Sequence, residues 1–200
     1  MSLPAWLDEP LTRGITLRGH ALLVHAGGDV GQFAYTQALA AAWLCEAPTP
    51  DGRACGQCTS CRLLDSGTHS DYRLLVPDAL RASLGLDWGE EEAAAEDKAS
   101  KAKPSKEIRI DAIRAALDWA HGTSARGRAK VLVLHPAEAL NMVAANALLK
   151  TLEEPPGLLR IVLTAHDPEV LLPTVRSRCQ RVTLPIPARD AALAWLAQQG

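Results

Sequence analysis

The chain has 200 residues, 48% of them hydrophobic, and 21 Lys+Arg against 23 Asp+Glu leave a formal net charge of −2. This length suits one domain of ordinary size with the start of a second, and the near-neutral charge excludes the bulk basicity that is typical of nucleic-acid-binding domains. No run approaches the about 18 consecutive apolar residues of a membrane span, and residues 1–10 lack the basic and apolar order of a secretion signal. We therefore expect a cytoplasmic protein without membrane contact.

Short continuous apolar runs recur along the chain. Because their residues are apolar without alternation, they are typical of strands that are buried on both faces. Stretches with helical periodicity lie between them, and this alternation predicts an α/β fold with a mostly parallel sheet and helices on both faces. The expected strands cover 21–25, 73–76, 131–134 and 161–164, with a weaker fifth at 181–184.

Three helices are expected between these runs. Residues 32–44 contain no helix breaker, and Asp111 and Asn141 each precede an apolar stripe with helical spacing, so both are predicted N-caps. Pro155 and Pro156 end the third helix, because a proline disfavours the helical conformation in the residue before it.

One segment breaks the alternation of strands and helices. An acidic block and a Lys/Ala/Ser tract at 87–107 carry too little apolar surface to offset their ordering entropy. We expect a flexible surface insertion over 79–107, with a short solvated helix over 90–97 as the alternative for its acidic part. After Pro187 an amphipathic helical pattern stops at the chain end, which predicts the start of a truncated second domain. The expected domains are 1–184 and 185–200.

A glycine-rich stretch, AGGDVGQF at 26–33, directly follows the first apolar run. Phosphate loops with the pattern G-x-x-x-x-G-K-[ST] stand at such a place, and their lysine and hydroxyl bind the phosphates and magnesium. Gly31 fits this pattern, but Ala26 replaces the first glycine, Gln32 the lysine and Phe33 the Ser/Thr. From these residues alone, the stretch is either a phosphate loop that lost its chemistry or a turn that never had it.

Four of the five cysteines are clustered as C-x9-C-x2-C-x2-C, at Cys45, Cys55, Cys58 and Cys61. Four thiolates suit a tetrahedral zinc ion, and a site with all four positions filled is structural and not catalytic. Two alternatives stay open: unpaired or disulfide-bonded cysteines, and His69 as a substitute ligand.

Two motifs carry a resemblance to a known family. NALLKTLEEPP at 146–156 and SRC at 177–179 resemble the clamp-loader branch of the AAA+ ATPases, and the four-cysteine insertion is similar to that of bacterial clamp-loader subunits. The resemblance covers roughly residues 15–185. It implies an AAA+ P-loop-type parallel sheet with flanking helices, a zinc-binding module at 45–61, and a small helical lid domain that begins near 185.

Within that family, the ATP-site residues separate motor subunits from non-motor subunits. Motors of the gamma and tau type need the loop lysine and hydroxyl, and an Asp-Glu pair after the third strand. Here Gln32 and Phe33 stand at the first pair and His135 and Pro136 at the second, and neither of the latter suits Mg²⁺, which prefers oxygen ligands. The resemblance therefore implies the delta-prime class, with bound zinc and no ATP hydrolysis by this chain. The degenerate loop consists of Gly27, Gly28, Gly31, Gln32 and Phe33.

Arg178 is the arginine of the SRC motif, which in the family projects into the ATP site of a neighbouring subunit. The resemblance implies that Arg178 acts as an arginine finger in trans, with a local ion pair as the alternative. The implied partners are the gamma/tau motors and delta, and, through the assembly, the sliding clamp and primer–template DNA. An active gamma/tau-like ATPase and an autonomous zinc nucleic-acid module are the competing functions.

Other residues near these motifs have simpler interpretations. Cys179 is expected to be a small buried apolar residue and not a fifth zinc ligand. Thr164 is expected to be a hydrogen-bonded strand end. For Lys150, Glu153 and Glu154 the sequence leaves open whether they are helix-face charges or contacts with a motor subunit.

Overall fold

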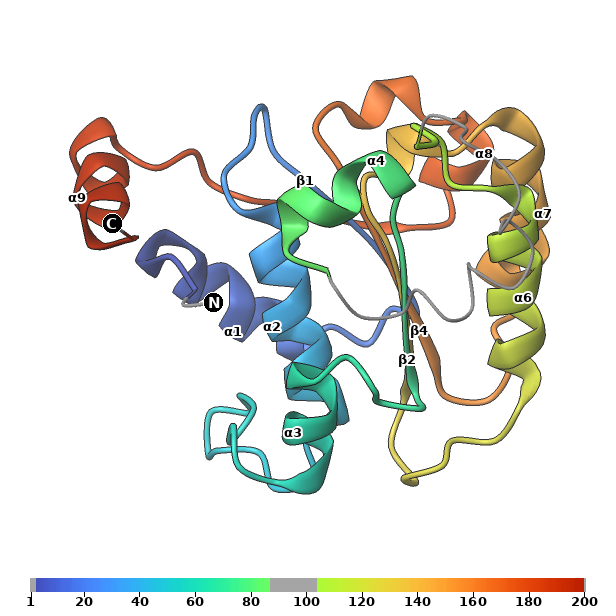
Figure 1. Ribbon diagram of the computed structural model, residues 1–200, viewed down its shortest axis with the longest axis horizontal. Coiled ribbons are helices and arrows are strands. Elements are labelled where there is room, and N and C mark those ends of the chain that lie inside the picture. The colour runs from blue at the N-terminus through green and yellow to red at the C-terminus, as the bar shows by residue number, and fades with distance from the viewer. Residues whose placement is uncertain (1–2, 87–103, 200) are drawn as a thin grey trace.

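A parallel sheet runs through the middle of the molecule (Figure 1). The structure is a computed structural model and describes residues 3–86 and 104–199. Five strands follow the order β2-β3-β4-β1-β5, and each neighbouring pair is parallel. They are β1 (Ala21–His25), β2 (Tyr72–Leu75), β3 (Lys130–Leu134), β4 (Leu159–Ala165) and β5 (Gln180–Thr183). The predicted α/β architecture is confirmed, and each predicted run matches a strand to within two residues at either end.

Helices flank the sheet on both faces, as Figure 1 shows. On one side lie α1 (Asp8–Thr16) and α2 (Gln32–Leu44), and on the other lie α6 (Ile110–His121) and α7 (Met142–Glu153). Shorter elements complete the chain: η1 (Ala5–Leu7), α3 (Thr59–Asp65), α4 (Asp78–Arg81), η2 (Ala82–Leu84), η3 (Ala137–Ala139), η4 (Pro168–Val170), α8 (Pro173–Arg176) and α9 (Arg189–Gln199).

Two hydrophobic clusters explain why the strands are apolar without alternation. Successive strand residues point to opposite faces of the sheet, and here both faces are covered. Leu23 of β1 belongs to the cluster that contains Ile113 of α6 and Leu148 of α7, whereas Leu22 belongs to the cluster that contains Leu39 of α2. Each such side chain contributes about 1.5–3 kcal/mol when fully buried, so both layers are needed to hold the sheet.

Of the two predicted N-caps, one is confirmed and one is wrong. The Asn141 side chain accepts a hydrogen bond from Ala144 N at 2.9 Å and caps α7. Helix α6 instead begins at Ile110, with Arg109 at the N-cap, and Asp111 lies in its first turn. The reason is tertiary: Ile108 is buried and bridges Leu140, so the chain turns into the helix directly after that contact.

The predicted insertion over 79–107 is partly described. Its beginning forms α4 and η2, Leu86 is buried, and Ala79 N donates to Ser105 O at 3.0 Å. Residues 87–103 lie outside the described residues, as does the alternative helix over 90–97. The flexible insertion and the domain boundaries stay predictions.

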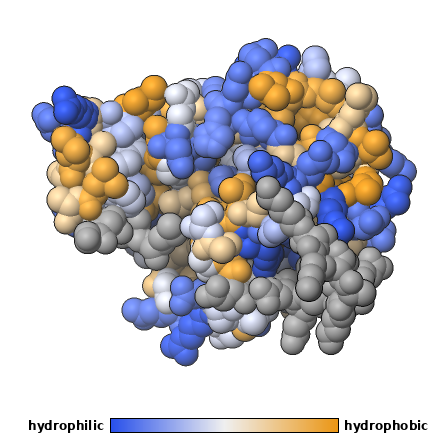
Figure 2. Space-filling model, turned by 45° about the horizontal axis from the view of Figure 1, so that its top comes forward, coloured by the Kyte–Doolittle hydropathy of each residue, from blue (hydrophilic) through white to orange (hydrophobic). Residues whose placement is uncertain are grey.

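Helix α9 lies apart from the sheet, beside the N-terminal segment (Figure 1). Its Trp195 ring meets Trp6 edge-on, with ring centroids 5.8 Å apart. Figure 2 shows hydrophobic surface over α9, at the left of the view, where Leu193 and Leu196 are exposed. Across residues 3–86 and 104–199, none of the helices combines the length and the apolar character that a membrane crossing requires.

Candidate functional site

The loop between β1 and α2 is closed by the side chain of Gln32. This side chain is only 2% exposed; its Oε1 accepts a hydrogen bond from Val30 N at 2.9 Å, and its Nε2 donates to Gly28 O at 2.5 Å. Gly31 adopts φ 99°, a left-handed conformation that glycine tolerates best, and this turn aims Gln32 back into the loop. Phosphate loops hold their ligand with free backbone N–H groups and a lysine. Here a glutamine, Gln32, stands at the position of that lysine, and its side chain accepts a hydrogen bond from Val30 N, one of the backbone N–H groups of the loop.

The loop is also covered by the N-terminal segment. Trp6 Nε1 donates to Val30 O at 2.9 Å, and Leu7 Cδ1 would lie 3.1 Å from a Cβ placed on Gly31. Nothing in the sequence pattern pointed to Trp6 or Leu7, because their contacts join segments more than 20 residues apart.

Phe33, His135 and Thr164 lie side by side where α2 begins and where β3 and β4 end. The Phe33 and His135 ring centroids are 4.9 Å apart, and His135 Nδ1 hydrogen-bonds Thr164 Oγ1 at 2.7 Å. Burial lowers the pKa of His135 to about 4, so its imidazole is neutral at pH 7. The two hydrogen-bonded groups are a neutral ring and a hydroxyl, a poor donor pair for Mg²⁺. The carboxylates of Asp29 and Glu138, whose charges act on the pKa of His135, accept hydrogen bonds from backbone N–H groups. The hydrogen-bonded state of Thr164 is as predicted.

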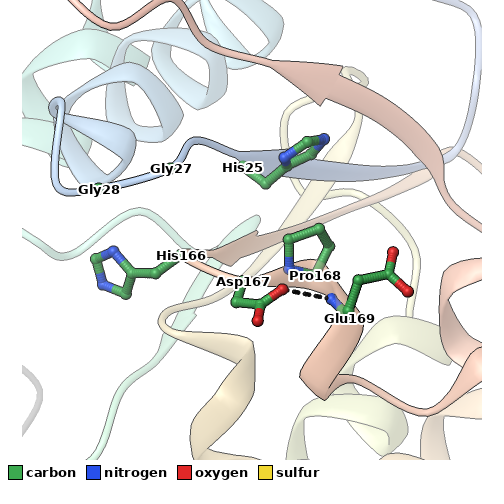
Figure 3. A pocket seen from close by; sticks show the side chains of 7 residues that line it. All are labelled: His25, Gly27, Gly28, His166, Asp167, Pro168 and Glu169. Atoms are coloured by element: carbon green, nitrogen blue, oxygen red, sulfur yellow. Dashed lines mark hydrogen bonds between the residues drawn. The ribbon is translucent and has the colours of Figure 1, made fainter.

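An open hollow of about 550 Å³ lies at the carboxyl ends of β1 and β4 (Figure 3). The Asp167 carboxylate accepts a hydrogen bond from Glu169 N at 2.9 Å, and the pKa of His25 is lowered, first by burial and then by the charge of Arg181. The lining contains neither lysine nor arginine, and the nearby Arg176 and Arg181 both pair with Glu169 of the lining. Its lining residues are His25, Gly27, Gly28, His166, Asp167, Pro168 and Glu169.

The four clustered cysteines converge at the far end of α2. Cys45 follows the last residue of that helix, and Cys58 caps α3, its sulfur accepting from Cys61 N. Ligand atoms of the four lie within 4.8 Å of one another, with Cys45 Sγ and Cys58 Sγ 3.8 Å apart. Four sulfurs at about 2.3 Å from a tetrahedral ion would be separated by roughly 3.8 Å. All four are free thiols, so the disulfide alternative is not realised, and the cluster could hold a metal ion.

Backbone groups around the cluster favour thiolates. Cys55 N donates to Cys45 Sγ and Cys58 N to Cys55 Sγ, both at 3.3 Å. Burial by itself would raise the pKa of Cys58, but hydrogen bonds, the strongest from the Cys61 backbone, lower it to about 6. Deprotonated sulfur is the form that binds metals. Burial raises the pKa of Cys45 and raises that of Cys61 to about 12, so the four thiols do not all ionise easily without a metal. The convergence of the four sulfurs is what fits the predicted zinc site.

His69 is engaged elsewhere and does not join the cluster. It is 3% exposed; its Nε2 hydrogen-bonds Ser60 Oγ and its Nδ1 accepts from Asp71 N, both at 3.1 Å. Arg126 Nε donates to the same Ser60 hydroxyl at 3.0 Å and to Glu46 Oε1 at 2.5 Å. This network, which sequence reasoning missed, fastens the cysteine module to the segment before β3.

Arg178 lies at the edge of the sheet opposite to the loop. Gln180 of β5 pairs with Leu22 of β1, so Arg178 stands near the level of His20, at the amino end of the strands. At about 3.3 Å per residue, the stretch from His20 to Gly27 spans roughly 20 Å. Arg178 therefore cannot reach the phosphate-loop position of its own chain.

Within this chain Arg178 forms a local ion pair. Its Nε donates to Glu153 Oε1 at 2.7 Å, its Nη2 donates to the same oxygen, and its Nη1 donates to Thr174 O at 2.8 Å. Both side chains remain partly exposed, 31% for Arg178 and 49% for Glu153. The ion-pair alternative is thus realised in the free chain, and it identifies Glu153 as the partner that sequence reasoning left open.

The neighbours of Arg178 have separate roles. Arg176 and Arg181 both pair with Glu169, Arg181 at 3.6 Å. Cys179 is buried, and burial raises its pKa to about 12, as expected for a small apolar core residue. It is not among the four cysteines that cluster.

Comparison with known proteins gives consistent results. Residues 16–188 match a family model described as DNA polymerase III, delta subunit. The chain is 40% identical over 185 residues to DNA polymerase III subunit delta' of Pseudomonas aeruginosa and 35% identical over 180 residues to that of Escherichia coli K12. These matches cover 92% and 90% of the chain but 49% and 46% of the relatives, so the chain spans about half of their length.

A solved structure shares the fold. The Thermotoga maritima protein described as related to the DNA polymerase III gamma subunit aligns with a TM-score of 0.53 and 24% identity, over 91% of this chain and 47% of that one. The sequence match, the parallel sheet and the cysteine cluster agree with one another. The chain therefore belongs to the DNA polymerase III delta-subunit family, among relatives named delta', as its motifs predicted.

Proposed function

We propose that this chain is the AAA+ part of a delta-prime subunit of the DNA polymerase III clamp loader. In this role it hydrolyses no ATP and supplies Arg178 to the ATP site of an adjoining gamma/tau motor. The motors and delta would open the sliding clamp, and the assembly would load it onto primer–template DNA in the cytoplasm.

The non-hydrolysing role is supported by the closed loop. Gln32 occupies Val30 N and Gly28 O, and Phe33 packs on His135. Four substitutions in two separated elements remove one chemistry, the binding of phosphate and magnesium. A gamma/tau-like ATPase, the competing function, would need at least one of the groups that these substitutions replace: the loop lysine, the loop hydroxyl or the acidic pair after the third strand.

The role in trans is supported by one observation above all, the position of Arg178. It lies on the strand edge away from its own loop, is partly exposed, and precedes a strand at the border of the sheet. A guanidinium at this place can meet a phosphate only on another subunit. Such arginines contribute about 10³–10⁵ to the rate in GTPases.

Zinc is the proposed occupant of the cysteine cluster, with a structural role. A module with no core of its own needs such a cross-link, and the cysteines leave no ligand position open for water. Arg53, one of the two arginines that flank the module, pairs with Asp8 at 2.7 Å and with Asp51 at 3.0 Å, which argues against a nucleic-acid-binding role for the module.

The decisive experiment is reconstitution of the clamp loader with the full-length protein carrying Arg178→Ala. ATP turnover in the presence of clamp and primed DNA should fall by about tenfold or more, while the variant still assembles with the motors. Arg13→Ala is the matched control, because Arg13 is exposed on α1 and pairs only with Glu9 within the described residues. Unchanged turnover with Arg178→Ala would refute the finger, and hydrolysis by the isolated chain above a buffer blank would refute the non-hydrolysing role.

A further inference from the structure

The contacts of Arg178 extend to a second residue at the same edge. Glu153 is the last residue of α7, and its Oε1 accepts from both Nε and Nη2 of Arg178. On the other side of the guanidinium, Nη1 donates to Thr174 O at 2.8 Å and more weakly to Ser177 Oγ at 3.4 Å. The planar group is therefore held from two directions, by the end of α7 and by α8.

This arrangement leaves donor capacity for an external ligand. A guanidinium has five N–H groups. The bonds above engage Nε–H, one N–H of Nη2 and the N–H groups of Nη1, so the second N–H of Nη2 has no acceptor among the described residues. Glu153 restrains the side chain without enclosing it, since 31% of the Arg178 side chain remains exposed.

The place of Glu153 on its helix is unfavourable for stability alone. The C-terminus of a helix carries partial negative charge and favours cations. Helix α7 instead ends with Glu153 and is followed by Glu154. An exposed ion pair adds little to folding, so stability gives a weak reason for an acidic residue here, whereas orientation of an arginine gives a direct one.

We propose that Glu153 is a positioning residue that pre-orients Arg178 for the γ-phosphate of a neighbouring subunit. This inference rests on the proposed function in trans. A free arginine side chain samples many rotamers, and holding it near one geometry before the subunits meet removes that cost from the transition state. Glu153 itself would touch neither nucleotide nor metal.

The test uses full-length protein in the reconstituted clamp loader with clamp and primed DNA. Glu153→Gln should lower kcat for ATP about two- to fivefold, with little change in KM, because an exposed pair of this kind is worth only a small factor. Glu154→Gln is the matched control: it removes the same charge at the same helix end, and its side chain has no partner among the described residues. It should retain wild-type kcat.

A double-mutant cycle separates positioning from other effects. If Glu153 acts through Arg178, Glu153→Gln should cause no further loss in an Arg178→Ala background. An equal loss in both backgrounds, a wild-type kcat with Glu153→Gln, or a higher kcat would each overturn the inference while leaving the finger intact. Unchanged turnover with Arg178→Ala itself would overturn the proposed function and, with it, the role of Glu153.

Discussion

The two edges of the sheet use their polar side chains in opposite ways. At the carboxyl edge, Gln32 and the His135–Thr164 pair make buried or partly buried hydrogen bonds to groups of their own chain. At the amino edge, Arg178 is paired but partly exposed, and its partner Glu153 is more exposed still. Buried polar groups contribute to stability because leaving them unpaired is costly, whereas exposed pairs contribute little and exchange partners readily.

The contrast has a consequence for mutation. Changes at the loop edge should reduce the stability of the fold and leave the activity of the assembly nearly intact. Changes at the amino edge, where Arg178 lies, should reduce the activity of the assembly and leave the stability of the fold nearly intact. The cysteine module lies at the far end of α2, the helix that begins at the loop. Changes in this module should show how much the stability of the loop edge depends on a distant cross-link.

The largest expected effect is the loss of the cysteine cross-link. Cys58→Ser should abolish the binding of about one zinc per chain and destabilise the fold by more than about 3 kcal/mol, because the module is fixed to the domain through Cys45 and the Glu46–Arg126 contact. Metal analysis and thermal unfolding measure both. Cys179→Ala is the control and should keep its metal; a metal-free preparation of the wild type with the same melting temperature would contradict the assignment.

The next effect is acid destabilisation through His135. Its pKa in the folded chain, about 4, lies below its ordinary value of 6.5. The unfolded chain therefore binds more protons between these values, so stability is full above pH 6.5 and decreases as the pH falls toward 4. The loss amounts to at most about 3 kcal/mol.

Urea unfolding of the zinc-loaded protein at pH 7 and pH 5 measures this loss. His25 and His69 also have lowered pKa values and act in the same direction, so His135→Phe serves as the comparison. That variant should lose less stability between the two pH values than the wild type. Equal losses would show that His135 titrates normally.

A smaller effect is expected at Gln32. Gln32→Ala leaves Val30 N and Gly28 O without their partner and should cost about 1–3 kcal/mol. ATP turnover of the reconstituted complex should stay near wild type. A large loss of turnover, with the variant fully folded, would mean that the loop retains a role in the assembly and would break the contrast between the two edges.

The smallest change in stability is expected at Arg178. Removing this partly exposed ion pair should alter the free energy of unfolding of the isolated chain by less than about 1 kcal/mol, although the same variant lowers turnover in the assembly. Denaturant unfolding of Arg178→Ala beside the wild type provides the measurement. A loss of several kcal/mol would make the arginine a structural residue first.

Sequence patterns predicted much of the fold because they are local. The strand runs followed from continuous apolar residues, and the Asn141 cap followed from one side chain and a nearby backbone N–H. The cap predicted at Asp111 was wrong because a distant contact, Ile108 with Leu140, sets where α6 begins. Because these two residues are far apart in the sequence, a window of ten residues does not reveal their contact.

The features of the candidate site also fall into two groups, those that the sequence predicted and those that only the tertiary structure revealed. Residue types alone were sufficient to identify a loop without lysine and four cysteines at metal-binding spacing, since each depends on chemistry that a side chain carries wherever it stands. Arg178 was singled out by the resemblance of its SRC motif to the clamp-loader family. Three-dimensional packing was needed to reveal that Gln32 turns back onto Val30 N, that Trp6 covers the loop, and that Glu153 holds Arg178. These contacts depend on which edge of the parallel sheet each segment reaches. The order of the strands decides this, and that order is a long-range property of the fold.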